Sequence, residues 1–239
     1  KEDNCVFYST AAEAEKAGFR PCLICRPELA PGMSAADAQT ALDGRAVRYL
    51  GENCTSGESL EALAANLGYT GRHLRRVFLE EYHVSPVEYI QTCRLLLAKA
   101  LLTDTNLPVT RVAMAAGFGS LRRFNDLFQK KYRLSPTCFR RQAGTKEAKS
   151  GAVTVALGYR PPYEWERLLR FLAMRAIPGV EAVSAGEYRR IVRTADKNGN
   201  ALFGWIRVGN CPAKNLLTVA MSESLLPALP RLLGRVRDL

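Results

Sequence analysis

The chain has 239 residues, 47% of them hydrophobic, enough for two or three compact domains. A formal net charge of +11 favours a polyanionic partner. No basic amphipathic helix with bulky apolar anchors and no apolar run of membrane-helix length occurs, so we expect no membrane partner. Seven cysteines, without the spacing of a disulfide scaffold, indicate a reducing compartment and a cytoplasmic protein. Four of them are expected to be packing residues: Cys54, Cys93, Cys138 and Cys211.

Near the amino terminus, Cys22 and Cys25 form a Cys-x-x-Cys motif. This motif is a common half-site for tetrahedral zinc, although alone it is a weak signal. A redox pair is the rival interpretation, but the βαβ surroundings of a thioredoxin-like site are missing. A zinc site needs two more ligands, and none is obvious: only Cys5 lies nearby, and both histidines are far downstream.

The residues around the motif resemble the second half of the Ada methyl-acceptor domain, through Val6-Phe7-Tyr8, an alanine-rich helix expected over 10–17, and Gly18-Phe19-Arg20-Pro21. In that family four cysteines bind one zinc, and a cysteine of an upstream pair accepts a methyl group from a DNA methylphosphotriester. The resemblance implies that Cys22 and Cys25 are zinc ligands and that residues 1–33 are a partial domain. Its zinc site would be a half-site and its chemistry could not run, so the chain is expected to be a fragment. Cys5 is expected to be a packing residue.

Residues 34–142 form the next expected domain, which opens with an amphipathic helix from Ala35 to about Leu50. Within it, residues 57–90 and 105–141 repeat each other. Phe78, Tyr82 and Ser85-Pro86 recur fifty residues later, whereas Gly68-Tyr69 recurs forty-nine residues later. The one-residue slip falls just before the following helix. Each repeat is predicted to be a helix, a glycine-containing turn, a second helix and a Ser-Pro turn, which is the helix-turn-helix signature.

Thr70 and Ser120 are predicted to cap the second helix of each unit, whose inward residues are apolar. The outward residues include arginines and an asparagine, which read guanine and adenine edges bidentately. A solvated helix face is the alternative, but recurrence at the same place in both repeats favours DNA. Lys130 and Lys131 are expected to contact phosphate. The predicted DNA-binding residues are Arg72, His73, Arg75, Arg76, Ser120, Leu121, Arg122, Arg123 and Asn125.

A longer helix is predicted to join the units, starting at Ser85-Pro86 and ending near Leu102. About 17 residues give roughly 26 Å, which could place two recognition helices in successive major grooves about 34 Å apart. This arrangement resembles the DNA-binding module of AraC-type regulators. The resemblance is carried by Gly68-Tyr69, Gly117-Phe118, Arg94-x-x-x-Ala98-x-x-Leu101-Leu102, and Tyr82-x-Val84-Ser85-Pro86. The predicted apolar stripe of the linking helix is Tyr89, Ile90, Cys93, Leu96, Leu97, Ala100 and Leu101.

Residues 143–151 are polar and charged, which predicts a linker, and 152–239 are predicted to form an α+β unit. Strands are expected at 153–157, 180–183, 188–193, 201–208 and 216–219, with a hairpin turn at Asn198-Gly199. Helices are expected from Tyr163 to Ala176 and from Ser222 to about Val236. The first of these should face inward through Trp165, Leu168, Leu169, Leu172 and Ala173.

Three stretches of this unit, 157–165, 171–181 and 186–190, resemble the amino-terminal domain of AlkA-type 3-methyladenine DNA glycosylases. In that family this domain is not catalytic, and the helix-hairpin-helix domain with the catalytic aspartate follows it. Because the sequence stops before such a domain, no catalytic residue is nominated. The basic residues here are expected to be ordinary solvated surface.

Together these resemblances match bacterial Ada/AlkA fusions of the adaptive response to alkylation. The expected fold is multidomain: an all-α double helix-turn-helix module flanked by a truncated zinc-type domain and an α+β antiparallel-sheet domain. The expected function is sequence-specific regulation of the alkylation response. The alternative is a fragment of a 3-methyladenine glycosylase, with the DNA-binding module serving damage recruitment, and whether the chain is an enzyme stays open. Candidate partners are promoter and alkylated duplex DNA and RNA polymerase, which implies a nucleoid-associated protein.

Overall fold

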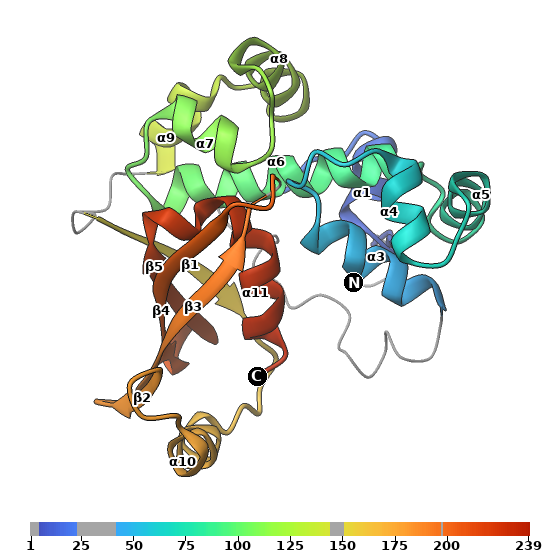
Figure 1. The fold of residues 1–239 in the computed structure, drawn as a ribbon. Coiled ribbons are helices and arrows are strands. Elements are labelled where there is room, and N and C mark those ends of the chain that lie inside the picture. Colours follow the sequence, from blue (N-terminus) through green and yellow to red (C-terminus); the bar gives the residue numbers. More distant parts are fainter. Residues whose placement is uncertain (1–4, 23–41, 144–150, 197) are drawn as a thin grey trace.

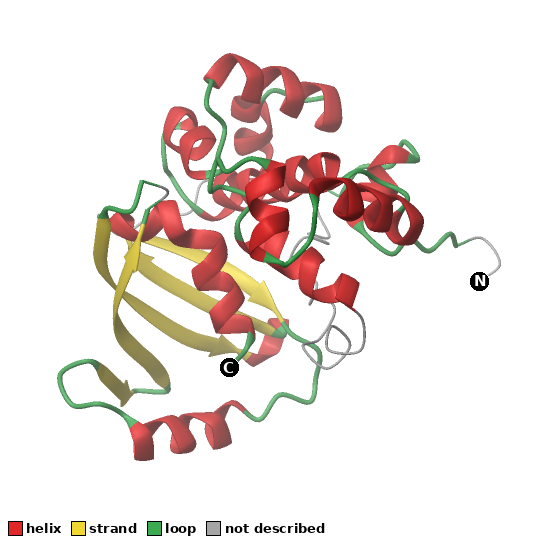
Figure 2. Ribbon diagram, turned by 45° about the vertical axis from the view of Figure 1, so that its right-hand side comes forward, coloured by secondary structure: helices red, strands yellow, loops and turns green. Residues whose placement is uncertain are grey.

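The computed structural model describes residues 5–22, 42–143, 151–196 and 198–239 (Figure 1). The amino-terminal part is helical and the carboxyl-terminal part contains the sheet (Figure 2). The helices of the first part are α1 (Ala11–Lys16), α3 (Leu42–Glu52), α4 (Leu60–Asn66), α5 (Gly71–Tyr82), α6 (Pro86–Asp104), α7 (Val109–Ala115), α8 (Leu121–Tyr132) and α9 (Pro136–Ala143). The helix predicted from Ala35 to about Leu50 corresponds to α3. Its residues 35–41 lie outside the described residues, and α3 ends at Glu52.

The linking helix α6 is the element against which the others pack. It begins with a capping box: Ser85 Oγ accepts from the Glu88 N–H at 3.2 Å, and Glu88 Oε2 accepts from the Ser85 N–H at 2.8 Å. Its 19 residues span about 28 Å. The predicted apolar stripe is only partly correct, because elements contact α6 on several sides. Four fully buried residues fall outside that stripe: Leu95, Ala98, Lys99 and Leu102.

The two repeats have matching three-dimensional structures. Thr70 caps α5 and Ser120 caps α8, and both helices end at a left-handed residue, His83 and Arg133. The aromatic residues that recur in the sequence form equivalent contacts. Phe78 packs against Tyr82 and Tyr89, and Phe128 packs against Tyr132 and Phe139. The extra residue of the second unit is Gly119, directly before the cap, where the slip was expected.

The carboxyl-terminal sheet has the strand order β1-β5-β4-β3-β2, and all neighbours are antiparallel. Asp196 accepts from the backbone of Asn198 and Asn200, which closes the predicted hairpin between β3 and β4. The strands are β1 (Ala152–Gly158), β2 (Glu181–Ser184), β3 (Glu187–Ala195), β4 (Ala201–Cys211) and β5 (Leu216–Ser222).

Two helices accompany the sheet, and both differ in detail from the prediction. Helix α10 (Trp165–Arg175) contacts β2 and β3 and leaves Ala173 exposed. The helix predicted from Ser222 is instead a 3-10 helix (Glu223–Ala228) followed by α11 (Leu229–Arg237). Pro227 cannot donate to an α-helical ladder, and Pro230 stands in the first turn of α11, where proline favours a helix start. Helix α11 lies across one face of the sheet (Figure 2).

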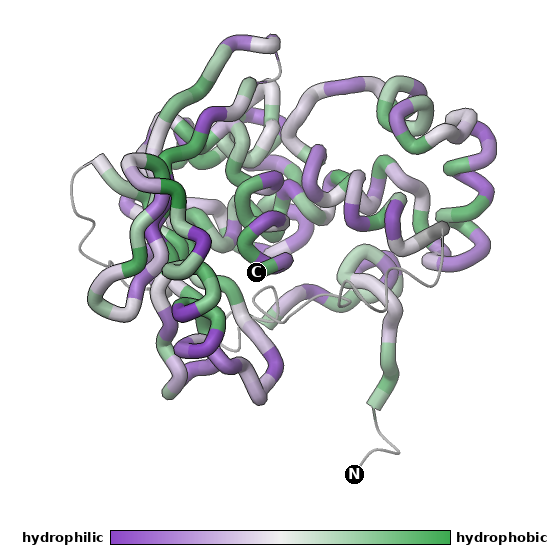
Figure 3. Tube along the Cα trace, turned by 60° about the horizontal axis from the view of Figure 1, so that its bottom comes forward, coloured by the Kyte–Doolittle hydropathy of each residue, from purple (hydrophilic) through white to green (hydrophobic). Residues whose placement is uncertain are grey.

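Hydrophobic and hydrophilic residues alternate along the chain (Figure 3). Among the described residues, the buried apolar side chains form two cores, and each crosses a predicted domain limit. The first joins α1 and α3 to the first helix-turn-helix unit, through residues such as Ala12, Leu50 and Phe78. The second joins α6 and the second unit to the sheet, through residues such as Leu101 and Val155. Asp104, at the end of α6, accepts from the backbone N–H of Ala156 in the edge strand β1 at 3.3 Å. The domain boundaries predicted from sequence, 1–33, 34–142 and 152–239, are not tested by these contacts and stay a prediction.

Candidate nucleic-acid interface

Helix α5 presents the predicted arginines to solvent. Arg72, Arg75 and Arg76 are exposed and His73 is half-buried, while Leu74 and Phe78 on the opposite face are fully buried. Arg75 donates to Glu61 of α4 at 2.7 Å, which lowers the pKa of that carboxyl. This contact orients the Arg75 guanidinium. The Glu61 carboxylate therefore competes with DNA phosphate for this guanidinium.

Helix α8 repeats the arrangement. Ser120, Arg122 and Arg123 are exposed, and Phe124 and Phe128 are fully buried on the inner face. Two predicted contacts are less accessible. Asn125 is half-buried, and Leu121 is half-buried and packs against the second core. Figure 1 shows α5 and α8 at the periphery of the helical part, where each can meet a groove of duplex DNA.

The turn at Gly117 packs the second unit against the loop that leads into the first. Gly117 has a φ of +82°, and a Cβ built there would lie 2.8 Å from Thr55 Cα, in the loop between α3 and α4. Beside it, the Arg94 guanidinium donates to the carbonyl of Cys54, and burial lowers the pKa of Arg94. Sequence reasoning missed Thr55 and Arg94 as positioning residues, since their contacts join segments far apart in the chain: Thr55 with Gly117, and Arg94 with Cys54.

Lys131 does not have the environment expected of a phosphate contact. Its ammonium lies 3.2 Å from the carboxylate of Glu15, whose side chain is 2% exposed. The same Glu15 oxygen accepts from Thr92 Oγ1 at 2.8 Å, and the neighbouring Lys16 donates to the carbonyl of His83 at 2.6 Å. Helix α1 therefore contacts α6 and the ends of both recognition helices. Lys130 is exposed, as expected.

The predicted metal ligands are described only in part. Cys22 is exposed, and its carbonyl accepts from the fully buried Lys99 at 3.0 Å, whereas Cys25 lies outside the described residues. Cys5, expected to be a packing residue, is exposed. Among the residues that the structure describes, no group of three His, Cys, Asp or Glu side chains could hold a metal ion. These residues do not complete a tetrahedral zinc site.

The other four cysteines that the structure describes were expected to be packing residues. Cys54 is buried, and Cys93, Cys138 and Cys211 are partly buried. Burial raises the pKa of the Cys93 thiol to about 11, so it is protonated at neutral pH. Within the described ranges, no helix has the length and apolar character needed to cross a membrane.

Three protein families match the chain. They are a helix-turn-helix domain at residues 63–142, the AlkA N-terminal domain at 154–239 and the metal binding domain of Ada at 1–28. A relative from Bacillus subtilis, "Bifunctional transcriptional activator/DNA repair enzyme AdaA", is 33% identical over 153 residues, covering 63% of this chain and 69% of the relative. The chain belongs to the family of this relative, the Ada/AlkA family.

Another member of this family is similar over more of the chain. The Mycobacterium tuberculosis "Probable bifunctional transcriptional activator/DNA repair enzyme AlkA" is 36% identical over 200 residues, covering 82% of this chain. The match spans only 40% of that relative's length. A solved AraC-type regulator from Chromobacterium violaceum is similar to 47% of this chain and 99% of its own, with 25% identity and a TM-score of 0.42. The three family matches and the elements described above confirm the expected fold and the family resemblance, and DNA is the partner that the helix-turn-helix family implies.

Proposed function

We propose that the chain is a sequence-specific duplex DNA-binding regulator of the response to DNA alkylation. One observation carries the proposal: two N-capped helices at equivalent places in the repeats present basic side chains outward, with Arg72 and Arg122 at the same position. The second unit also packs at Gly117 against Thr55, in the loop that leads into the first. Phosphate contacts would orient the module, and Arg72, Arg122 and Asn125 would read base edges in two successive major grooves.

The family membership supports the finer assignments. Promoter and alkylated duplex DNA would be the nucleic-acid partners, RNA polymerase the protein partner, and the nucleoid the place of action. Cys22 and Cys25 would supply two thiolates to a zinc site whose other ligands come from residues beyond this pair. The domain limits proposed from sequence stay as stated, with 143–151 as the linker.

A glycosylase role is the second candidate, favoured by the match of residues 154–239 to the AlkA N-terminal domain. In that case the helix-turn-helix module would recruit the protein to damaged DNA. The two candidates differ in what they require of the duplex. A regulator enriches one sequence from a random pool of undamaged DNA, whereas a recruitment module enriches alkylated duplexes of any sequence.

Selection from a random duplex pool tests the proposal, followed by binding of variants to the enriched site. Arg72→Ala and Asn125→Ala should each lose roughly 1–3 kcal/mol on that site and much less on random duplex. Arg235→Ala, an exposed arginine on α11, is the matched control. Six phosphate contacts would give a slope of log K against log salt of about −5. A pool without an enriched motif, or with single half-sites only, would refute two-groove docking.

A further inference from the structure

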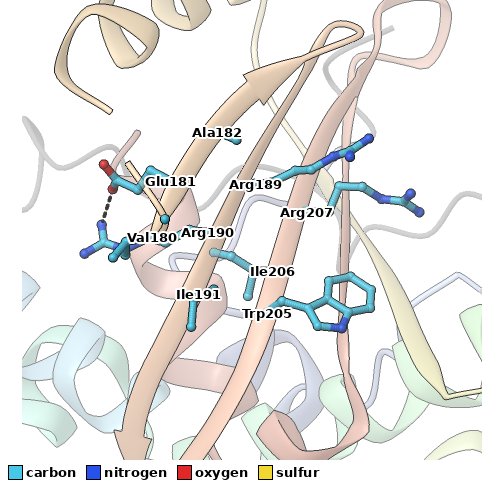
Figure 4. Close-up of a pocket in the computed structure, with 10 residues that line it drawn as sticks. Val180, Glu181, Ala182, Arg189, Arg190, Ile191, Trp205, Ile206 and Arg207 are labelled. Atoms are coloured by element: carbon cyan, nitrogen blue, oxygen red, sulfur yellow. Dashed lines mark ion pairs between the residues drawn. The ribbon is translucent and has the colours of Figure 1, made fainter. Parts of the chain in front are cut away.

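One face of the sheet carries a row of arginine and aromatic side chains that the helix-turn-helix module does not explain. On β3 and β4, successive cross-strand pairs on this face are Arg189 with Arg207, Ile191 with Trp205, and Arg193 with Phe203. We call these six residues the arginine–aromatic face. Figure 4 shows Arg189, Arg207 and Trp205 projecting to the same side of the sheet.

This face is unusually apolar for a solvent-facing surface. Ile191 is 55% exposed, Phe203 59% and Trp205 40%, and the strand register makes them contiguous. Large exposed apolar groups that are contiguous and rimmed by polar residues mark binding sites. The opposite face of the same strands is buried, with Val192 and Val208 under the 3-10 turn and α11.

The charges on this face point to an anion. Arg189 and Arg207 lie directly opposite each other, a like-charge pairing that destabilises a sheet unless something offsets it. Glu187 offers one carboxylate to both guanidinium groups, 3.0 Å from Arg189 and 3.7 Å from Arg207. With Arg193 on the same face, three guanidinium groups face a single carboxylate, so the net charge of the face is positive.

Four of these six residues, Arg189, Ile191, Trp205 and Arg207, line an open hollow of about 430 Å³, a size at which small ligands are bound. The segment from Gly179 to Ala182 forms one side, and Ile191 and Trp205 form apolar walls. Arg189 and Arg207 stand at its edge (Figure 4). The hollow thus combines an aromatic ring, an apolar wall and paired cations, and its lining also includes the Glu181–Arg190 ion pair (3.0 Å).

We propose that the arginine–aromatic face binds single-stranded DNA. A base stacks on the ring of Trp205, and the flanking phosphates lie against Arg189 and Arg207. Arg193 already lies over the Phe203 ring at 5.5 Å, so its guanidinium plane offers a second stacking surface. Exposed aromatic rings beside arginines are how sheet surfaces hold unpaired strands without reading their sequence. A protein partner would need matching acidic groups, whereas every nucleotide brings both a ring and an anion.

Tryptophan fluorescence tests this directly, because the chain has two tryptophans and the other, Trp165, is 4% exposed on the buried side of its helix. Adding an oligo-dT strand should quench Trp205 saturably, in wild type and in Trp165→Phe. An abasic strand of equal length should bind electrostatically with little quenching. Loss of one stacking ring in Trp205→Ala should weaken binding to a single-stranded probe roughly 5- to 150-fold.

Two further variants separate this site from the recognition helices. Arg189→Ala/Arg207→Ala should weaken quenching in the wild-type background at least about tenfold, whereas Arg235→Ala should not. The double variant Arg72→Ala/Arg122→Ala, which should weaken sequence-specific binding to duplex DNA, should leave the quenching of Trp205 by oligo-dT unchanged. The proposal is overturned if oligo-dT gives no quenching, if the abasic strand quenches equally, or if the paired arginine variant behaves as wild type. It is also overturned if the face proves to be a self-association surface that Trp205→Ala disrupts without affecting strand binding.

Discussion

The carboxylate of Glu15 and the ammonium of Lys131 lie 3.2 Å apart, although 116 residues separate them in the chain. The contact joins the first helix to the last turn of the second recognition helix. Because the same carboxylate accepts from Thr92 on α6, helix α1, which precedes Cys22, is held against both the linking helix and the second recognition helix.

Lys130 and Lys131 are adjacent but should behave differently. Lys131→Ala leaves a buried carboxylate without its cation, so the free energy of unfolding should fall by about 1–3 kcal/mol, discounted because Lys131 is a third exposed. Lys130→Ala should change stability by less than about 0.5 kcal/mol. Urea denaturation of both variants measures the difference.

In DNA binding the order should be reversed: the Lys130 substitution should have the larger effect and the Lys131 substitution the smaller one. Lys130→Ala should flatten the salt dependence of duplex binding by about one unit, and Lys131→Ala should leave that slope unchanged. Equal slopes for the two variants would mean that Lys131 exchanges Glu15 for phosphate on binding.

Gly68 and Gly117 occupy equivalent turns and form a matched pair for substitution. Both have left-handed φ angles, so alanine should cost about 1–2 kcal/mol at either site. A Cβ at Gly68 meets open space, but one at Gly117 would lie 2.8 Å from Thr55 Cα. Gly117→Ala should therefore cost about 1–3 kcal/mol more.

Measurement of binding to one and to two half-sites completes this test. Gly117→Ala should lose more affinity for the double site than for a single one, because the units no longer sit at a fixed separation. If Gly68→Ala showed the same selective loss, the Thr55 contact would not be what orients the units.

The capping box of α6 predicts a pH-dependent contribution to stability. The Ser85 N–H and hydroxyl donate to Glu88 and lower its pKa below the value in the unfolded chain. A lowered pKa in the folded state stabilises the protein above the unfolded value of about 4.3, and this contribution disappears as the pH falls through the folded pKa. Glu88→Gln should cost up to about 1 kcal/mol at pH 7 and nothing in strong acid. Glu81→Gln, an exposed carboxylate on α5, should cost little at either pH.

The elements that repeat were predictable from sequence because each is defined by local signals. Caps at Thr70 and Ser120, left-handed glycines and the spacing of Phe78 and Phe128 need no tertiary information. The packing of α6 was less predictable, because an apolar stripe assumes one buried face, whereas elements on several sides also bury Lys99. Contacts between distant segments, such as Glu15 with Lys131 and Gly117 with Thr55, leave no periodic trace in the sequence.

The second core has a consequence for how the molecule melts. Since the sheet and the second helix-turn-helix unit share one set of buried side chains, neither can lose its structure while the other keeps its packing. Differential scanning calorimetry should therefore record no separate transition for residues 152–239. The largest endotherm should carry the enthalpy of the sheet and of α7 to α9 together, with calorimetric and van't Hoff enthalpies in agreement for that block. The part that matches the AlkA N-terminal domain is thus a structural half of the molecule, and heat would unfold it and the second helix-turn-helix unit in a single event.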